Sequence, residues 1–369
     1  MANITESKII DAMKTVMDPE LHKDLVTLNM IKDVKISGTD VELTVVLTTP
    51  ACPLKGKIEA DVRAAIAKHV PEATNLKVNM SSNVMGRKEA LQENLAPTIK
   101  NIIAVSSGKG GVGKSTVAVN LALALAETGA NVGIMDADIY GPSVPLMLDI
   151  AKPKITGNDK NKMYPPENYG LKVMSIGFFV KDGDPVMWRG PMLHSAIRQF
   201  LGDTLWGDLD YLIVDLPPGT GDAQMSLTQC VTVTGVVGVT TPQDVALLDS
   251  DKGLAMFTKL KVPVLGIVEN MSFFDCPHCH HHTEVFSHGG GEKTAAKFNA
   301  PLLGKLPLNP IVREGGDAGR PVFVSHPEST EANIFREIAA KLAAQASIAN
   351  ANDGRSKPPI NVSFGGVTN

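Results

Sequence analysis

The stretch Ser106–Thr116 reads SSGKGGVGKST and directly follows the apolar run Ile102–Val105. It contains a complete phosphate-binding loop, G-x-x-x-x-G-K-S/T, and we predict a strand before it and a helix from Lys114 to about Glu127 after it. Glycines let successive backbone N–H groups wrap a phosphate at a helix N-terminus, where the helix dipole favours negative charge. The sequence therefore predicts nucleotide binding, with Lys114 on the terminal phosphates and Ser115 on Mg²⁺. The predicted nucleotide contacts in this loop are Gly108, Lys109, Gly110, Gly111, Val112, Gly113, Lys114, Ser115 and Thr116.

A second lysine, Lys109, stands directly after the first glycine of the loop, where an ordinary phosphate loop does not need one. The string GKGGVGKS matches the deviant Walker A pattern, and the chain thereby resembles the superclass of MinD, ParA and the nitrogenase iron protein. This resemblance implies an ATP-sandwich homodimer in which Lys109 reaches the nucleotide of the other subunit and acts with Lys114 in catalysis. The alternative from the residues alone is a solvated surface lysine.

The bulk properties are those of an ordinary globular protein, with 369 residues, 43% hydrophobic and 20% charged. At roughly 100–200 residues per domain, we expect one large domain or two unequal ones. The net charge is −4 without a dense run of Lys and Arg, which argues against nucleic acid as a partner. Because no segment resembles a signal peptide or approaches about 18 apolar residues, we predict a cytoplasmic protein without a membrane partner.

The chain is predicted to contain two domains of different architecture. Residues 1–85 are expected to form a small α+β domain, followed by a polar linker at residues 86–98. In residues 99–346, nearly continuous apolar strands alternate with helices, which predicts an α/β P-loop NTPase domain whose mostly parallel sheet is covered by helices on both faces. Residues 347–369 are predicted to be a disordered tail. The expected strands are Ile31–Ile36, Val41–Leu47, Asn75–Met80, Ile102–Val105, Val132–Met135, Val173–Ile176, Leu212–Val214, Val231–Val239, Val264–Val268 and Leu302–Leu306.

Carboxylates follow two of these apolar runs. A carboxylate at the end of a buried strand is costly unless it meets a cation or a water. In the D-x-D string after Val132–Met135, Asp138 resembles the residue of the superclass that orients the attacking water and touches the magnesium shell, and a turn cap is the alternative. Asp215 ends the strand of a Walker B pattern and is expected to hold Mg²⁺ through water. The glycines that follow it, Gly219 and Gly221, suit a segment that changes conformation when the γ-phosphate leaves.

Asn270 closes the apolar run Val264–Val268. It resembles the adenine-reading asparagine of the same superclass, because its amide offers both a donor and an acceptor. A plain turn-forming asparagine is the alternative.

Four cysteines are too few for a disulfide framework, and a close pair in a reducing compartment suggests a metal site. Cys276 and Cys279 form a C-x-x-C turn that supplies two of the four thiolates a cluster or metal needs. A two-fold dimer would bring two such pairs together. Thioredoxin-like redox exchange is an alternative, although that pair opens a helix after an early strand. His280–His282 keep a zinc site open as a further alternative.

The other two cysteines have less specific surroundings. Cys52 precedes Pro53, which we expect to open a helix, so that Cys52 is placed at the helix N-cap where the dipole favours a thiolate. A buried apolar cysteine is the alternative. Cys230 is expected to be buried in a helix.

The ordered strings SSGKGGVGKST, DADIYGPSVP, DLPPGTGD, ENMSFFDCPHC and FSHGGGEK resemble the Mrp/ApbC family of ATP-dependent iron–sulfur cluster carriers over residues 99–345. With MDPEL and TTPACP, residues 1–85 resemble the small iron–sulfur assembly domain often fused ahead of it. The resemblance implies a weak ATP hydrolase that uses ATP and Mg²⁺ and holds a [4Fe-4S] cluster between Cys276 and Cys279 of two subunits. Apo iron–sulfur proteins and a cluster-assembly scaffold are the implied partners. The run His280–His282 departs from the family, which usually has Gly and fewer histidines there.

Other functions within the superclass stay open at this point. A MinD/ParA-like positioning switch would need a membrane-binding amphipathic helix or a basic face, and the Pro- and Gly-broken tail 351–369 offers neither. A zinc-binding P-loop regulator would use the cysteines with the histidines. A dethiobiotin-synthetase-like ligase would not need the cysteine pair.

Overall fold

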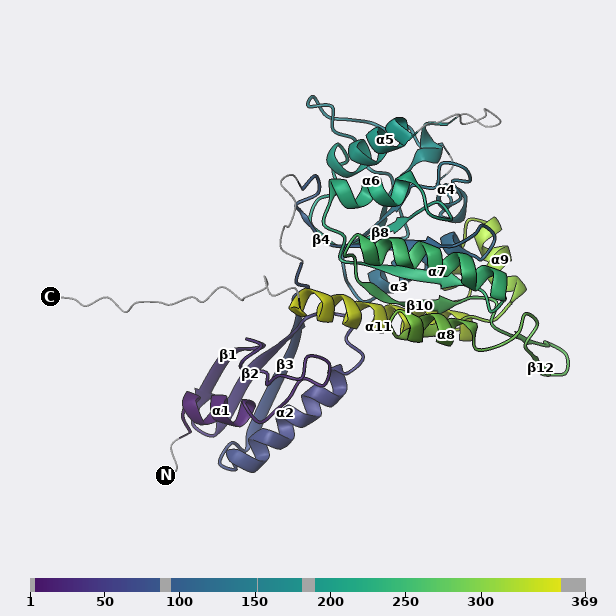
Figure 1. Cartoon of the computed structure of the whole chain (residues 1–369). Coiled ribbons are helices and arrows are strands. Elements are labelled where there is room, and N and C mark those ends of the chain that lie inside the picture. The colour runs from purple at the N-terminus through teal and green to yellow at the C-terminus, as the bar shows by residue number, and fades with distance from the viewer. Residues whose placement is uncertain (1–3, 87–93, 151, 181–189, 353–369) are drawn as a thin grey trace. The chain divides into compact units, whose positions relative to one another are not determined.

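The computed structural model describes residues 4–86, 94–150, 152–180 and 190–352 of the chain. They divide into two compact units (Figure 1). The small unit is built on residues 4–47 and 54–83, and the large unit on residues 48–53, 84–86 and the described residues from 94 to 349. Among the described residues, no helix is long and apolar enough to cross a membrane.

The small unit has two helices packed on one face of a three-stranded sheet of order β1-β2-β3 (Figure 1). β1 and β2 form an antiparallel hairpin, whereas β3 lies parallel to β2. Alternate residues of β2, from Val41 to Leu47, are buried, because successive side chains of a strand point to opposite faces. The first helix ends at Met13. The bounds are α1 Glu6–Met13, β1 Ile31–Ser37, β2 Asp40–Leu47, α2 Lys55–His69 and β3 Asn75–Ser82.

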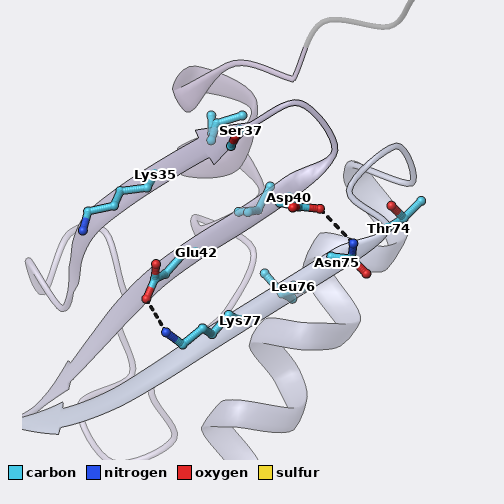
Figure 2. Close-up of a pocket in the computed structure, with 10 residues that line it drawn as sticks. Lys35, Ser37, Asp40, Glu42, Thr74, Asn75, Leu76 and Lys77 are labelled. Atoms are coloured by element: carbon cyan, nitrogen blue, oxygen red, sulfur yellow. Dashed lines mark hydrogen bonds and ion pairs between the residues drawn. The ribbon is translucent and has the colours of Figure 1, made fainter.

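The other face of this sheet is open and polar (Figure 2). A cavity of about 700 Å³ lies there, lined by residues of all three strands. Asn75 donates to Asp40 and Lys77 to Glu42, both at 2.8 Å, and the hydrogen bond from Lys77 lowers the pKa of Glu42. Because these carboxylates are already paired, and no predicted site residue lines the cavity, we assign it no ligand.

The large unit is built on an eight-stranded sheet of order β13-β10-β9-β4-β8-β5-β7-β6. All neighbouring strands are parallel except the edge strand β6, which confirms the predicted fold class. A second, two-stranded sheet, β11-β12, carries the cysteine pair. The bounds are β4 Ile99–Ser107, β5 Val132–Asp136, β6 Glu167–Asn168, β7 Leu171–Ser175, β8 Leu209–Asp215, β9 Gly235–Thr240, β10 Val264–Glu269, β11 Phe274–Asp275, β12 His282–Thr283 and β13 Leu302–Lys305.

Helices cover both faces of the large sheet, because its central strands are apolar on both sides. In β4, Ile103 and Val105 belong to one core cluster, with α3, α4, α10 and α11, while Ile102 and Ala104 belong to the other, with α5, α6, α7 and α8. The helix bounds are α3 Lys114–Glu127, α4 Val144–Met147, η1 Ile176–Phe178, α5 Gly190–Gly202, α6 Asp222–Cys230, α7 Asp244–Lys259, α8 Gly290–Lys297, α9 Pro310–Asp317, α10 Val322–Ser325 and α11 Thr330–Asn352.

Two predicted boundaries differ most from the structure. The strand expected at Val231–Val239 begins only at Gly235, because α6 occupies the chain up to Cys230. The tail was predicted to begin at residue 347, but α11 continues to Asn352, since the partly buried Ala349 packs against the same core as Ala346. The rest of the predicted tail, 353–369, and residues 87–93 of the predicted linker lie outside the described residues.

Candidate functional site

The phosphate loop connects β4 to α3, as the sequence predicts. Gly113, with φ of 82°, is the N-cap of α3 and adopts the left-handed conformation that glycine favours. The loop borders a cavity of about 250 Å³ at the N-terminus of this helix, a position that suits an anion. The cavity is lined by Ser107, Lys109, Gly110, Gly111, Gly113, Lys114, Ser115, Thr116, Asp138, Gly141, Ser143, Met147 and Pro218.

The first glycine of the loop is required by a close approach of the helix α7. A Cβ atom at Gly108 would lie 2.0 Å from the backbone nitrogen of Ser250, which is closer than any side chain tolerates. On the other side of the loop, Gly219 donates its N–H to the carbonyl of Ser107 at 2.8 Å. The segment after β8 is thereby bonded to the end of β4, directly before the phosphate loop.

Lys114 lies between the two predicted acidic residues. Its Nζ is 2.6 Å from Oδ1 of Asp215 and 3.5 Å from Oδ2 of Asp138, and the side chain is only 6% exposed. Burial raises the pKa of Asp215, and the charge of Lys114 opposes this shift. The second oxygen of Asp215, Oδ2, is buried and has no hydrogen-bond partner among the described residues. An orphaned carboxylate oxygen at this place fits a hydrated cation.

Asp136 has a different part in the same site, one that the sequence analysis did not foresee. Its carboxylate accepts hydrogen bonds from the backbone nitrogens of Asp138, at 3.1 Å, and Val144, at 3.3 Å, and from Oγ of Ser175, at 3.0 Å. Burial, together with the charge of Asp215, raises the pKa of Asp136 to about 8. Asp136 therefore shapes the loop that carries Asp138. The D-x-D spacing was its only sequence signal.

Asn270 contacts the phosphate loop from the end of β10. Its Nδ2 donates to the carbonyl of Val112 at 2.8 Å. A second cavity, of about 190 Å³, begins here and shares Gly113, Thr116 and Met147 with the first, so the two are adjacent. Sequence reasoning missed its remaining lining residues, which apart from Met271 lie in no motif: Met271, Pro307, Leu308, Asn309, Val312, Arg313, Gly316 and Asp317.

Lys109 lies half-buried at the rim of the first cavity. Its Nζ is 3.5 Å from Oε1 of Gln243, the N-cap residue of α7. In the first turns of that helix, Val245 and Leu248 are 64% and 63% exposed. Whether Lys109 reaches a second subunit stays a prediction.

The cysteine pair lies in the turn between the antiparallel strands β11 and β12. The turn is closed by hydrogen bonds from Cys276 N to His281 O at 3.1 Å and from His280 N to Cys276 O at 2.8 Å. Backbone N–H groups of Cys279 and His278 bond to the thiol of Cys276 and lower its pKa. Cys279 is exposed and Cys276 partly so. The turn therefore presents two neighbouring sulfur atoms to solvent, one of them stabilised as a thiolate.

Of the neighbouring histidines, His282 makes two contacts with side chains near the cysteine pair. His282 has its Nδ1 2.7 Å from Oδ1 of Asp275, and its ring lies 4.7 Å from that of Phe273. In the part of the chain that the structure describes, no three His, Cys, Asp or Glu side chains are grouped as metal ligands.

Cys230 and Cys52 lie outside the cysteine hairpin. Cys230 is the buried last residue of α6, as predicted. The N-cap position predicted for Cys52 is wrong, because a turn at Pro53 and Leu54 delays the helix, and Leu54 is the N-cap of α2.

A strand, a glycine-rich loop and a helix in a mostly parallel sheet, with acidic residues at the ends of the adjacent β5 and β8, define a P-loop NTPase. A family model described as NUBPL iron-transfer P-loop NTPase matches residues 98–343. The chain belongs to this family. A second model, described as iron-sulfur cluster assembly protein, matches residues 6–80.

Known relatives are similar over most of the chain. The iron-sulfur cluster carrier protein of Deinococcus radiodurans is 49% identical, covering 95% of this chain and 99% of that protein. The protein of the same name from Escherichia coli is 53% identical, covering 72% of each.

Solved structures resemble the large unit. A nucleotide-binding protein from Archaeoglobus fulgidus, in complex with ADP, is 39% identical with a TM-score of 0.56, covering 65% of this chain and 93% of that one. The cell division ATPase MinD of Pyrococcus furiosus is 25% identical with a TM-score of 0.52, covering 65% of this chain and 97% of that one.

Proposed function

We propose that the protein is an ATP-dependent iron–sulfur cluster carrier. It binds a [4Fe-4S] cluster at a homodimer interface, transfers the cluster to apo-proteins and hydrolyses ATP slowly. The observation that carries this proposal is the presence, in one chain of this family, of a complete phosphate site and a solvent-exposed pair of cysteines. The names of the relatives, which are cluster carriers, support it.

The phosphates of ATP bind in the cavity of the phosphate loop, on the backbone N–H groups at the start of α3. Ser115 and Asp215 hold Mg²⁺, which neutralises charge on the phosphates when it is bound. The buried, unpartnered Oδ2 of Asp215 supports this assignment. Lys114 binds the terminal phosphates, and Asp138, held in place by Asp136, orients the attacking water.

The nucleoside occupies the second cavity, which adjoins the first and is lined by Asn270. Asn270 donates one amide hydrogen to the carbonyl of Val112, so its side chain holds the phosphate loop in place. The same side chain borders the base. We assign Asn270 an adenine-reading role beside this structural one.

The cluster is cargo, held by the thiolates of Cys276 and Cys279. Each hairpin supplies two sulfur ligands, and a [4Fe-4S] cluster takes four thiolates, so two chains share one cluster. Hydrogen bonds from backbone N–H groups to the sulfur of Cys276 favour the thiolate form that binds iron. Exposure of the turn suits a cluster that has to be passed on.

The homodimer brings the nucleotide sites face to face. Val245 and Leu248 expose large apolar side chains on α7, the helix whose N-cap residue Gln243 is near Lys109. Exposed apolar groups beside a functional site are typical of a contact surface. This arrangement supports the reach of Lys109 to the partner's nucleotide.

Anaerobic reconstitution with iron and sulfide tests the proposal, with absorption and EPR spectra as the readout. Cys276→Ser and Cys279→Ser should each lose the cluster but keep ATP binding, because neither residue touches the phosphate loop. Cys52→Ser, in a different turn of the chain, is the matched control and should keep the cluster. Wild-type protein should pass the cluster to an apo-ferredoxin. A cluster retained by the double variant, or tight stoichiometric zinc without added metal, would contradict the proposal.

A further inference from the structure

Glu269, the last residue of β10, is fully buried and stands in the sequence between the phosphate loop and the cysteine pair. The residue after it is Asn270, whose amide donates to Val112 in the phosphate loop. A buried carboxylate is costly unless it accepts hydrogen bonds. The partners of Glu269 are therefore informative about what this charge is for.

The two carboxylate oxygens of Glu269 accept hydrogen bonds from the two ends of residues 272–291. We call this segment, which leaves the sheet after β10 and returns at α8, the excursion. Oε1 accepts from the hydroxyl of Ser272 at 2.5 Å, and Oε2 accepts from the backbone nitrogen of Gly291 at 2.5 Å. Ser272 stands directly before the residues that lead into β11, and Gly291 lies in the first turn of α8, after the excursion has returned. Cys276 and Cys279 lie between these two points.

The glycines of the FSHGGGEK string make this arrangement possible. A Cβ atom at Gly291 would lie 2.9 Å from Cβ of Glu269 and 3.1 Å from its Oε2, so a larger residue would push the helix off the carboxylate. A Cβ atom at Gly290 would lie 2.9 Å from Leu247 of α7 and 3.0 Å from the backbone of Pro242. The N-cap of α8 is Gly289, which has no side chain for capping, and Glu269 accepts from the helix in its place.

We propose that Glu269 is a positioning residue that couples the phosphate loop to the cysteine hairpin. It rests on the proposed function, since it links the nucleotide to the cluster ligands of that function. A shift of the phosphate loop on nucleotide binding moves Asn270 through its bond to Val112. The neighbouring Glu269 passes this shift to both ends of the excursion at once, through Ser272 and Gly291. The geometry of Cys276 and Cys279 thereby follows the nucleotide state.

The test measures how fast Cys276 and Cys279 of the cluster-free, full-length protein react with iodoacetamide, by peptide mass spectrometry, with and without Mg-ATP. For wild type we expect ATP to change this rate by about fivefold or more, the lower range of coupling between two sites. Glu269→Gln, which exchanges one acceptor for a donor, and Ser272→Ala, which removes only a hydroxyl, should bind ATP as wild type does but lose the rate change.

Glu292→Gln is the matched control. Glu292 lies on α8, next to Gly291, but its half-exposed side chain pairs with Lys305 rather than with the hairpin. This variant should therefore respond to ATP as wild type does. If Glu269→Gln fails to fold, Ser272→Ala decides. A full ATP response in Ser272→Ala and Glu269→Gln, or none in wild type, would overturn the coupling. The thiol reactivity is measured on cluster-free protein. Absence of an ATP response is therefore distinct from failure of Cys276 and Cys279 to bind iron.

Discussion

At the scale of single residues, the two lysines of the phosphate loop are expected to differ in what they stabilise. Lys114 is buried against Asp215 and Asp138, whereas Lys109 is half-buried near a neutral glutamine. Removing one partner of a buried ion pair typically costs about 3–5 kcal/mol, because the other charge is left uncompensated. Lys114→Ala should therefore unfold at lower urea concentration. It should also lose ATP turnover, because the proposed contact with the terminal phosphates is removed. Lys109→Ala should lose turnover with nearly unchanged stability.

Steady-state ATP hydrolysis and urea unfolding measure these two effects. Mixing either lysine variant with Asp138→Ala chains would show whether active sites are shared between subunits. Wild-type turnover in Lys109→Ala would contradict the assignment of a deviant Walker A loop.

Gly108 and Gly110 make a second contrast at the same scale. Gly108→Ala puts a Cβ atom into the backbone of Ser250, whereas a Cβ atom at Gly110 meets nothing within 4 Å. In the absence of nucleotide, Gly108→Ala should lower the midpoint of thermal unfolding by several degrees, since overpacking typically costs about 1–3 kcal/mol. Gly110→Ala should leave the midpoint unchanged. Equal midpoints for the two variants would show that the loop does not pack on α7 as described.

At the scale of elements, substitutions in the cysteine hairpin test whether its histidines bind the metal. His280 adopts a left-handed φ of 56°, a conformation that glycine takes up without strain. His280→Gly and His281→Ala should therefore keep the full iron content after reconstitution. His282→Ala should lower it, because it removes the contacts with Asp275 and Phe273. Loss of iron from His280→Gly or His281→Ala would indicate that imidazoles ligate the metal.

The elements also show how far sequence reasoning reaches. The phosphate loop, α3, the end of β8 at Asp215 and the turn after β5 that holds Asp138 were predictable, because their residues are consecutive in motifs with a single chemical use. The bonds of Asn270 to Val112 and of Glu269 to Gly291 join distant segments, and no local pattern encodes such contacts. The placement of Cys52 at an N-cap failed because a turn at Pro53 and Leu54 separates Cys52 from the first residue of α2.

At the scale of the whole molecule, every residue assigned to ATP lies in the large unit. A truncated chain that starts at Asn94 keeps all of these residues, although it lacks residues 48–53 and 84–86 of the large unit, and should bind and hydrolyse ATP at close to the wild-type rate. Cluster transfer to an apo-protein should change, because the small domain matches a family of cluster assembly proteins. A folded truncated chain that binds no ATP would show that this division of labour is wrong. The cytoplasmic location stays a prediction.

The most direct test of the central claim is the native mass of the reconstituted protein, measured under anaerobic conditions. The proposal predicts a dimer that carries one [4Fe-4S] cluster, with about two iron atoms per chain, since four thiolates come from two hairpins. Wild-type chains mixed with Cys276→Ser, Cys279→Ser double-variant chains should give mixed dimers without a stable cluster. A monomer with a complete cluster, or a dimer with two clusters, would contradict a cluster shared between the Cys276 and Cys279 pairs of two chains.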